Sequence, residues 1–360
     1  VSSLTTNTTG QFNVAIGDQA LSDNTTASNN TAVGHNALIA NTTGSPVDAF
    51  GYRAVGSNTT GTQNAGFGWY SLYRNTTGIN NNAFGGQTLY SNTTGESNSG
   101  FGVNALLLNT TGSSNTAVGT QALDSNTTAS NNTAVGRNAL AANTTGANNA
   151  ALGGNAGASS TTGPNNVFLG YAAGNHVTPT TSGSEQTLLG SYTYAPATAT
   201  ALIAIGHAVQ GSQGYTTLGY STSDIRAQNG VATWSTVSDE RYKKDITDST
   251  AGLSFINALQ PRTWNYRTLG ELPETFNAYE EGSTEVFKNT QTNHGFIAQE
   301  VKAAIDADSG LKDGFRLWDD REDGSQEVAE AALIPILVKA IQEQTAVIAA
   351  LTARITTLEG

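Results

Sequence analysis

The chain has 360 residues, no cysteine and a formal net charge of −12. Residues 1–229 contain no lysine and four arginines, so the chain is a poor candidate for binding nucleic acid, which relies on Lys and Arg to neutralise phosphates. The lack of cysteine excludes a disulfide framework and a thiolate metal site.

A strict internal repeat occupies residues 1–176. The triplet Asn-Thr-Thr recurs every 17 residues from Asn7, and a degenerate tenth copy begins at Ser160. In every copy a glycine stands ten positions after the start, directly preceded by a large apolar residue. An invariant period without insertions predicts a solenoid whose copies stack in register. The large apolar residues form one column: Ile16, Val33, Phe50, Phe67, Phe84, Phe101, Val118, Val135, Leu152 and Leu169.

Each copy is expected to form a coil of short parallel strands, because the glycine and the Asn-Thr-Thr-Gly turn disfavour a helix. We expect the large apolar column to point into a narrow core, and the Ala or Gly on the alternate face to contact sister chains. The pattern Asn-x-Ala-apolar-Gly, followed by Ala-Leu as at Ala105-Leu106, resembles the head repeats of trimeric autotransporter adhesins. The resemblance implies a parallel β-roll assembled as a homotrimer.

Four aromatic residues, Trp69, Tyr70, Tyr73 and Tyr90, cluster in two neighbouring copies. Trp and Tyr are favoured contact residues, so one interpretation is a surface that binds a host receptor or glycan. The other interpretation is that these rings cover coil surface or pack between chains. The sequence leaves both open.

The repeat becomes irregular at 177–237, where strand-like segments at 187–190, 201–206 and 215–219 are expected to close the stack. The four histidines have no partner at metal-ligand spacing. We therefore expect neither a metal nor a cofactor.

Four sequence blocks follow in order, namely SDERYKKDI (238–246), GLSFINALQPRTWNY (252–266), HGFIAQEV (294–301) and ALIPILVKAIQEQ (332–344). They resemble the C-terminal intramolecular chaperone, or peptidase S74, domain of phage tailspikes and tail fibres. The resemblance implies a module that trimerises, guides folding of the fibre ahead of it and releases itself by autoproteolysis. Carried over by position, Ser238 is the nucleophile and Lys243 the base, Asp239 and Arg241 complete the motif, and cleavage occurs next to Ser238.

The chemistry of a serine–lysine pair restricts its geometry. A serine hydroxyl needs a base to take its proton, and a lysine serves as that base only where burial disfavours its charge. Residues five apart on an α-helix lie about 140° round the axis, so Ser238 and Lys243 do not meet on one helix. Either Ser238 precedes the helix in an extended turn, or Lys243 reaches a sister chain's serine. The alternative is that Ser238 is only an N-cap and Lys243 a solvated residue.

Between the blocks we expect a small α+β domain with Trp264, Tyr266, Phe296 and Ile297 in its core. The C-terminal segment is expected to form a coiled-coil helix, because two columns step by seven residues. Ile at position a with Leu at position d leans toward two strands, but we expect three, the symmetry of the fibre that precedes the helix. The two columns are Ile334, Ile341, Ile348 and Ile355, and Leu337, Gln344, Leu351 and Leu358.

We divide the chain into a β-roll head or shaft (1–176), a closure and linker (177–237), a chaperone and autoprotease core (238–328) and a coiled-coil helix (329–360). The predicted protein is a phage tail fibre or tailspike segment, made in the host cytoplasm and located on the virion tail, and a single-turnover self-cleaving serine endopeptidase. The alternatives are a trimeric bacterial adhesin head and a fibre with a non-cleaving chaperone. Without a run of 18 apolar residues we expect no membrane insertion, and the scarcity of paired carboxylates argues against glycan hydrolysis.

Overall fold

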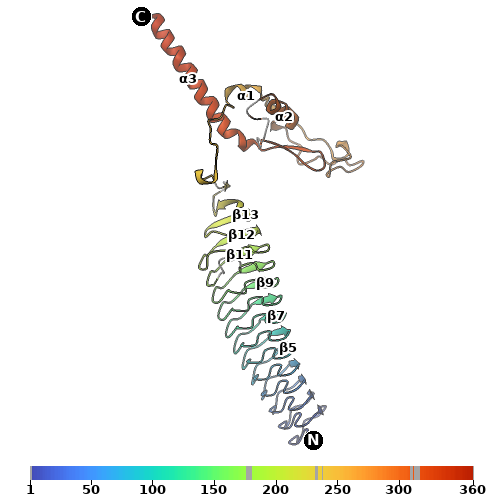
Figure 1. Ribbon diagram of the computed structural model, residues 1–360. Coiled ribbons are helices and arrows are strands. Elements are labelled where there is room, and N and C mark those ends of the chain that lie inside the picture. The colour runs from blue at the N-terminus through green and yellow to red at the C-terminus, as the bar shows by residue number, and fades with distance from the viewer. Residues whose placement is uncertain are drawn as a thin grey trace. The chain divides into compact units, whose positions relative to one another are not determined.

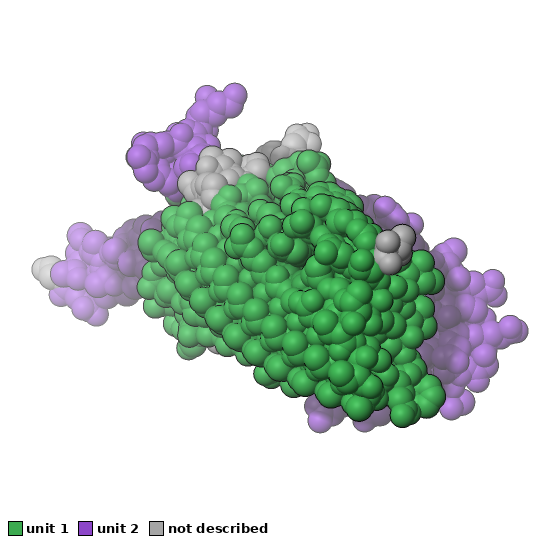
Figure 2. All heavy atoms as spheres, turned by 90° about the horizontal axis from the view of Figure 1, so that it is seen from below, with its two compact units in different colours: residues 1–238 green, residues 239–360 purple. Residues whose placement is uncertain are grey.

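The chain forms two compact units, Val1–Ser238 and Asp239–Gly360, which Figure 2 distinguishes by colour. The computed structural model describes residues 2–175, 181–231, 234–236, 238–308, 311 and 317–359. The first unit is a stack of short strands, and the second combines helices with small two-stranded sheets (Figure 1).

The first unit is one sheet of 15 strands in chain order. Pairing is parallel from β1 to β13 and antiparallel from β13 through β15, so a short meander closes this end of the stack. The strands are β1 (Val14–Ile16), β2 (Thr31–Val33), β3 (Val47–Phe50), β4 (Asn64–Phe67), β5 (Asn82–Phe84), β6 (Ser99–Phe101), β7 (Thr116–Val118), β8 (Thr133–Val135), β9 (Ala150–Leu152), β10 (Val167–Leu169), β11 (Gln186–Leu189), β12 (Leu202–His207), β13 (Tyr215–Tyr220), β14 (Ser223–Gln228) and β15 (Ser235–Thr236).

The pairing register confirms the predicted solenoid of 17-residue coils. From β1 to β10 every residue pairs with the one 17 positions later, as Val14 does with Thr31. The register then widens once, where Val167 pairs with Thr187, and shortens afterwards. The three strand-like segments predicted for the irregular part are β11, β12 and β13.

The prediction that the large apolar column fills the core is wrong. The residue at the strand centre points inward instead, as Ala32, Ala49 and Ala117 do, together with the Ala-Leu pairs of the following turn, such as Ala37-Leu38. The large column points outward, and Ile16 is 60% exposed and Leu152 52%. The physical reason is space, because the buried leucines fill the narrow interior and leave room only for a small residue at the strand centre, while adjacent strand residues face opposite sides. The centre of β10 is the buried Phe168, and there glycines, Gly157 and Gly174, stand at the leucine positions and lie against its ring.

The glycine column is required by the close approach of successive coils. Gly68 has φ +138°, in the region that favours glycine, and a Cβ added there would lie 2.4 Å from the carbonyl oxygen of Gly85. The same contact with the next coil recurs along the column. Any side chain at these positions therefore separates two coils.

A second special conformation belongs to the buried leucines. Their φ angles lie between 49° and 55°, which L-residues rarely adopt. Each backbone N–H donates to a carbonyl of the next coil, as Leu38 does to Ala54 (2.9 Å) and Leu106 to Ala122 (3.0 Å). Contact with a neighbouring coil thus holds the conformation. These leucines are Leu21, Leu38, Leu72, Leu89, Leu106, Leu123 and Leu140.

The asparagines of the Asn-Thr-Thr triplets form a buried ladder along the stack. Each side-chain amide donates to the side-chain oxygen of the asparagine one coil earlier, as Asn92 Nδ2 does to Asn75 Oδ1 (2.8 Å). Each also donates to the carbonyl three residues on, so that it caps its own turn. At Ser160 the ladder ends, and both Asn143 Oδ1 and Ser160 Oγ are buried without a partner.

The second unit is α+β, as predicted, with a core formed where three helices pack together. Phe255, Val301, Ile305, Leu333 and Ile336 are among its buried residues. The elements are η1 (Glu240–Tyr242), α1 (Leu253–Ala258), β16 (Arg262–Trp264), η2 (Leu269–Glu271), β17 (Asn293–Gly295), α2 (Ala298–Ala307), β18 (Trp318–Asp320), β19 (Gln326–Val328), η3 (Glu330–Leu333) and α3 (Ile334–Glu359).

The four residues predicted for this core, three of them aromatic, lie at its edge. Trp264, Tyr266 and Ile297 are half-buried and line a cavity, and Phe296 both packs against the core and lines the cavity. The prediction of a core position is therefore wrong for the first three. Phe255 on α1 and aliphatic residues on α2 and α3 close the core without them.

Helix α3 confirms the predicted C-terminal helix. Its beginning packs on α1, where Glu343 Oε2 accepts the backbone N–H of Leu253 (2.8 Å). The seam of the predicted coiled coil is exposed, and Ile341 and Ile348 are 61% and 63% accessible. By length and composition alone, the helical segment Glu330–Glu359 also qualifies as a candidate membrane span, with a mean hydropathy of 1.4. The expectation that it does not enter a membrane stays a prediction.

Candidate functional site

The SDERYK motif folds into a single 3-10 turn, η1. Asp239 is its N-cap, with extended backbone, and its carboxylate accepts the backbone N–H of Arg241 (2.9 Å). The Arg241 guanidinium returns to the same carboxylate through Nε (2.9 Å) and Nη2 (2.6 Å). Lys243 ends the turn in extended conformation, donating its backbone N–H to the carbonyl of Glu240 (2.9 Å). The structure thus brings the two supporting residues, Asp239 and Arg241, into a bidentate pair.

This pair defines the electrostatics of the turn. Hydrogen bonds from the side chain and backbone of Arg241 lower the pKa of Asp239, and the positive charge of Lys243 adds a smaller effect in the same direction. The carboxylate also raises the pKa of Arg241. The Asp239–Arg241 pair therefore stabilises the turn that lies between Ser238 and Lys243.

Ser238 and Lys243 flank the turn on opposite sides, and both are exposed. The idea that Ser238 is the N-cap is wrong, because Asp239 occupies that position. Of the two geometries that permit a dyad, the one in which Ser238 precedes the helix matches the backbone seen here. The dyad itself stays a prediction.

The four aromatic residues singled out in the repeat form one cluster with three neighbours, here called the arginine–aromatic patch. Tyr70 makes edge contacts with Tyr73 and Tyr90, at ring-centroid distances of 5.0 and 5.9 Å. Tyr73 stacks on Tyr90 at 5.5 Å. The members of the patch are Tyr52, Arg53, Trp69, Tyr70, Tyr73, Arg74 and Tyr90.

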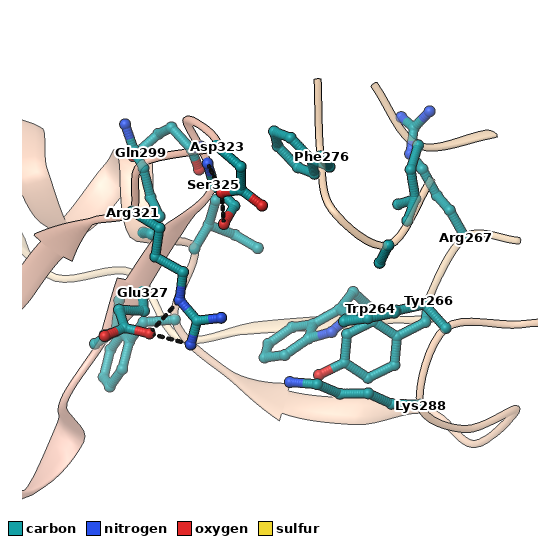
Figure 3. Close-up of a pocket in the computed structure, with 18 of the residues that line it drawn as sticks. Trp264, Tyr266, Arg267, Phe276, Lys288, Gln299, Arg321, Asp323, Ser325 and Glu327 are labelled. Carbon is teal, nitrogen blue, oxygen red and sulfur yellow. Dashed lines mark hydrogen bonds and ion pairs between the residues drawn. The ribbon is translucent and has the colours of Figure 1, made fainter. Parts of the chain in front are cut away.

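The second unit contains a cavity of about 850 Å³ that the sequence did not reveal (Figure 3). On one wall Trp264 and Tyr266 meet edge to face at 6.4 Å, and the Lys288 ammonium lies 5.5 Å from the Tyr266 ring centroid. The spacing of the two rings in the segment RTWNYR was the available signal. Alternation places residues 264 and 266 on one face, but burial in a core explained that pattern equally well.

The opposite wall of the cavity is polar. Arg321 Nε donates to Glu327 Oε2 (2.8 Å), and Asp323 accepts from the Ser325 hydroxyl (2.6 Å). Hydrogen bonds from Ser325 and from the Asn277 backbone lower the pKa of Asp323 to about 2. The cavity thus combines an aromatic wall with a charged one. Within the described residues, no group of three His, Cys, Asp or Glu is placed to hold a metal ion.

Comparison with known proteins gives one match, to the second unit. Searches among curated proteins and among solved structures returned no match. Three of the four sequence blocks lie inside the matched segment, and the fourth, on η3 and α3, lies beyond it. Residues 238–309 match the family model Peptidase_S74, described as the chaperone of endosialidase, so the chain carries a β-solenoid followed directly by a segment of this chaperone type.

Proposed function

We propose that the chain is a segment of a phage tail fibre or tailspike, located on the virion tail, that attaches to the host surface. Its C-terminal unit acts as a trimerisation chaperone and then releases itself by cleavage next to Ser238. The observation that carries this proposal is a coincidence of boundaries. The first compact unit ends at Ser238, the family match begins at the same residue, and the η1 turn follows at once.

The trimer is supported by two apolar surfaces that a single chain leaves in water. On the solenoid, the rings of Phe50, Phe67, Phe84 and Phe101 stack at 4.6 to 5.1 Å along the outward column. Among all outward-facing residues of β1–β10, the single charged group is Asp48. On α3 the apolar residues that recur every seven positions are also exposed to solvent. Continuous apolar surfaces of this kind mark contacts between chains, and a homotrimer buries both.

The interface between copies is therefore assigned to the large apolar column. The sequence placed it on the small-residue face, but in the structure that face is the interior of the coil. Burying one phenylalanine contributes about 1.5–3 kcal/mol, so even the four stacked rings make a substantial contribution to assembly.

In the proposed cleavage, Ser238 supplies the nucleophile and Lys243 the base. Ser238 Oγ adds to the carbonyl carbon of residue 237, and the hydroxyl proton passes to the Lys243 amine. The peptide nitrogen of Ser238 then leaves with that proton, and residue 237 is held as an ester on Oγ. Water hydrolyses the ester to a carboxylate and restores the hydroxyl. The products are 1–237 and 238–360.

Assembly is proposed as the trigger for this step. A lysine amine acts as a base only where burial disfavours its charge. Lys243 is exposed in the single chain, so a second surface must cover it before it can act. We assign that surface to a sister chain, so cleavage would occur only after the chains have assembled correctly.

Intact-mass measurement of freshly purified protein tests the proposal. Wild type is expected as fragments 1–237 and 238–360, whereas Ser238→Ala and Lys243→Ala each remain at full length. Lys244→Ala is the matched control, an exposed neighbour that should still cleave. An intact wild-type mass in a protein that has assembled as a trimer removes the cleavage step and leaves the chaperone role. Cleavage in the Lys243→Ala variant removes the dyad.

A further inference from the structure

The arginine–aromatic patch lies on three successive coils, where the chain turns after strands β3, β4 and β5. The solenoid fold does not require it. Positions equivalent to Trp69 in later coils carry Val103, Thr120 and Arg137, and these coils keep the same register and the same buried leucines. The patch is therefore a local addition to a repeat that folds without it.

The patch holds half of the basic residues of 1–229, and neither is paired with an acid. Arg53 lies over the rings of Tyr52 and Tyr70, 5.6 and 6.0 Å from their centroids, and Arg74 lies 5.2 Å from that of Tyr90. Arg53 Nη1 contacts the Tyr73 hydroxyl at 3.4 Å, while its buried Nε has no hydrogen-bond partner. Within the described residues no carboxylate forms an ion pair with either guanidinium. Both positive charges are thus available to a ligand.

Trp69 supplies an exposed flat surface next to these charges. Its side chain is 49% exposed and lies against the backbone of Gly86, where an added Cβ would be 2.3 Å from Nε1 and 2.4 Å from Cε2. Its edge contact with Tyr70, at a centroid distance of 6.3 Å, ties the indole to the rest of the patch. The absence of a side chain at Gly86 therefore lets the indole lie close to the coil.

We propose that the arginine–aromatic patch binds a carboxylate-bearing oligosaccharide, with a sugar ring on Trp69 and a carboxylate on Arg74 and Arg53. The apolar face of a sugar ring packs on an aromatic surface, while a guanidinium binds a carboxylate through two parallel hydrogen bonds. A neutral saccharide leaves the charges unused, and nucleic acid is disfavoured because two arginines on a unit without lysine in 1–229 neutralise too few phosphates. The proposal names the ligand class for host attachment and rests on that part of the proposed function.

Calorimetric titration of the full-length Ser238→Ala protein tests the proposal independently of cleavage. The probes are oligogalacturonate and oligosialic acid, two sources of sugar carboxylate, and neutral galactan oligosaccharides of matched length. Binding is expected for at least one carboxylated probe, at least about tenfold tighter than for the neutral one. Binding to neither carboxylated probe, or equal binding to all three, would overturn the proposal.

Variants locate the site. Arg74→Ala and Trp69→Ala are each expected to weaken binding about tenfold or more, and Arg74→Lys, which keeps the charge but not the paired donors, falls between. Arg137→Ala, on a coil outside the patch, is the control and should leave affinity unchanged. Circular dichroism confirms that each variant stays folded. Equal losses in Arg137→Ala and Arg74→Ala would mean that general charge, rather than the patch, attracts the saccharide, and would overturn the assignment.

Discussion

The two units of the chain differ in how far apart in sequence their contacts lie. In the solenoid most hydrogen bonds join a residue to one about 17 positions away, the others close turns within a coil, and the same contacts repeat coil after coil. In the second unit the defining contacts are individual and distant, such as Glu343 with Leu253 and Arg262 with Glu300. The first unit can therefore grow by copying its neighbour, whereas the second must find its partners by closing long loops.

This difference suggests why a fibre of this type would need a chaperone. The buried leucines adopt a left-handed conformation that hydrogen bonds to a neighbouring coil hold in place. The first coil to fold has no folded neighbour that could supply these hydrogen bonds, so starting the stack is unfavourable. A separate unit that gathers three chains would supply the missing starting point. Changing one contact of each kind tests whether the two units differ in this way.

The largest effect is expected from Gly68→Ala. The new Cβ would lie 2.4 Å from the carbonyl oxygen of Gly85, in a backbone region that L-residues avoid, and because contacts are copied the defect spreads to both neighbouring coils. We expect a loss of roughly 3 kcal/mol, measured by thermal unfolding of the purified protein. Gly154→Ala is the control, since its added Cβ would meet only Tyr171, at an ordinary 3.4 Å. Equal stability of the two variants would contradict the close-packed glycine column.

Phe67→Glu is expected to act on assembly and leave the coil fold intact. The ring lies between those of Phe50 and Phe84 on the outward column, and a charge there would be buried between copies. Losing that contact costs about 1.5–3 kcal/mol per chain, which shifts the proposed trimer toward monomer in analytical ultracentrifugation. Thr77→Glu, at an exposed turn, should remain trimeric. A trimeric Phe67→Glu protein would exclude this column from the interface.

Ser160→Asn is expected to stabilise the solenoid by repairing its ladder. The introduced amide can donate to Asn143 Oδ1, which is buried without a partner. A gain of about 1 kcal/mol is expected, read as a higher thermal midpoint. Ser160→Ala separates this effect from removal of the unpartnered hydroxyl. If both variants gain equally, the ladder is not the cause.

The smallest effect is expected on the stability of the second unit at acidic pH. The pKa of Asp323 is lowered to about 2 by its hydrogen bonds to Ser325 and Asn277, below its ordinary value of 3.8. Its contribution to stability is therefore fully present above pH 4 and is lost as the pH falls toward 2. Asp323→Asn should flatten the pH dependence of unfolding in this range, measured on fragment 238–360 if it folds alone and otherwise on the full chain. An unchanged pH profile would show that these hydrogen bonds do not stabilise the fold.

The period of the sequence was sufficient to predict the solenoid, because a repeat without insertions permits only stacking in register. It was not sufficient to tell inside from outside. Ala49 and Phe50 are adjacent on one strand, and the usual association of large apolar residues with the core selected the wrong face. That association assumes room for a large side chain at the strand centre, and in most coils a buried leucine of the following turn already occupies that room.

For the candidate site, the motif predicted which residues gather at the junction but not what each does in the turn. The pairing of Asp239 with Arg241 depends on a 3-10 turn that the spacing alone did not define. The cavity beside Trp264 depends on loops between residues 265 and 328 whose packing has no periodic signature. The apolar seam of α3 was predicted because its residues recur with a period of seven.

The 17-residue register also means that the length of the fibre changes in steps of one coil. Since each column is defined by residues 17 apart, an insertion of another size would move residues out of their columns unless the extra residues are held in a loop outside the strands. Extra residues are accepted once, where the register widens between β10 and β11, near the closing meander. Length variants should therefore differ by whole coils of about 4.8 Å, copied as one coding block. Recombination between near-identical repeats would then adjust the reach of the fibre without redesigning its fold or the unit that assembles it.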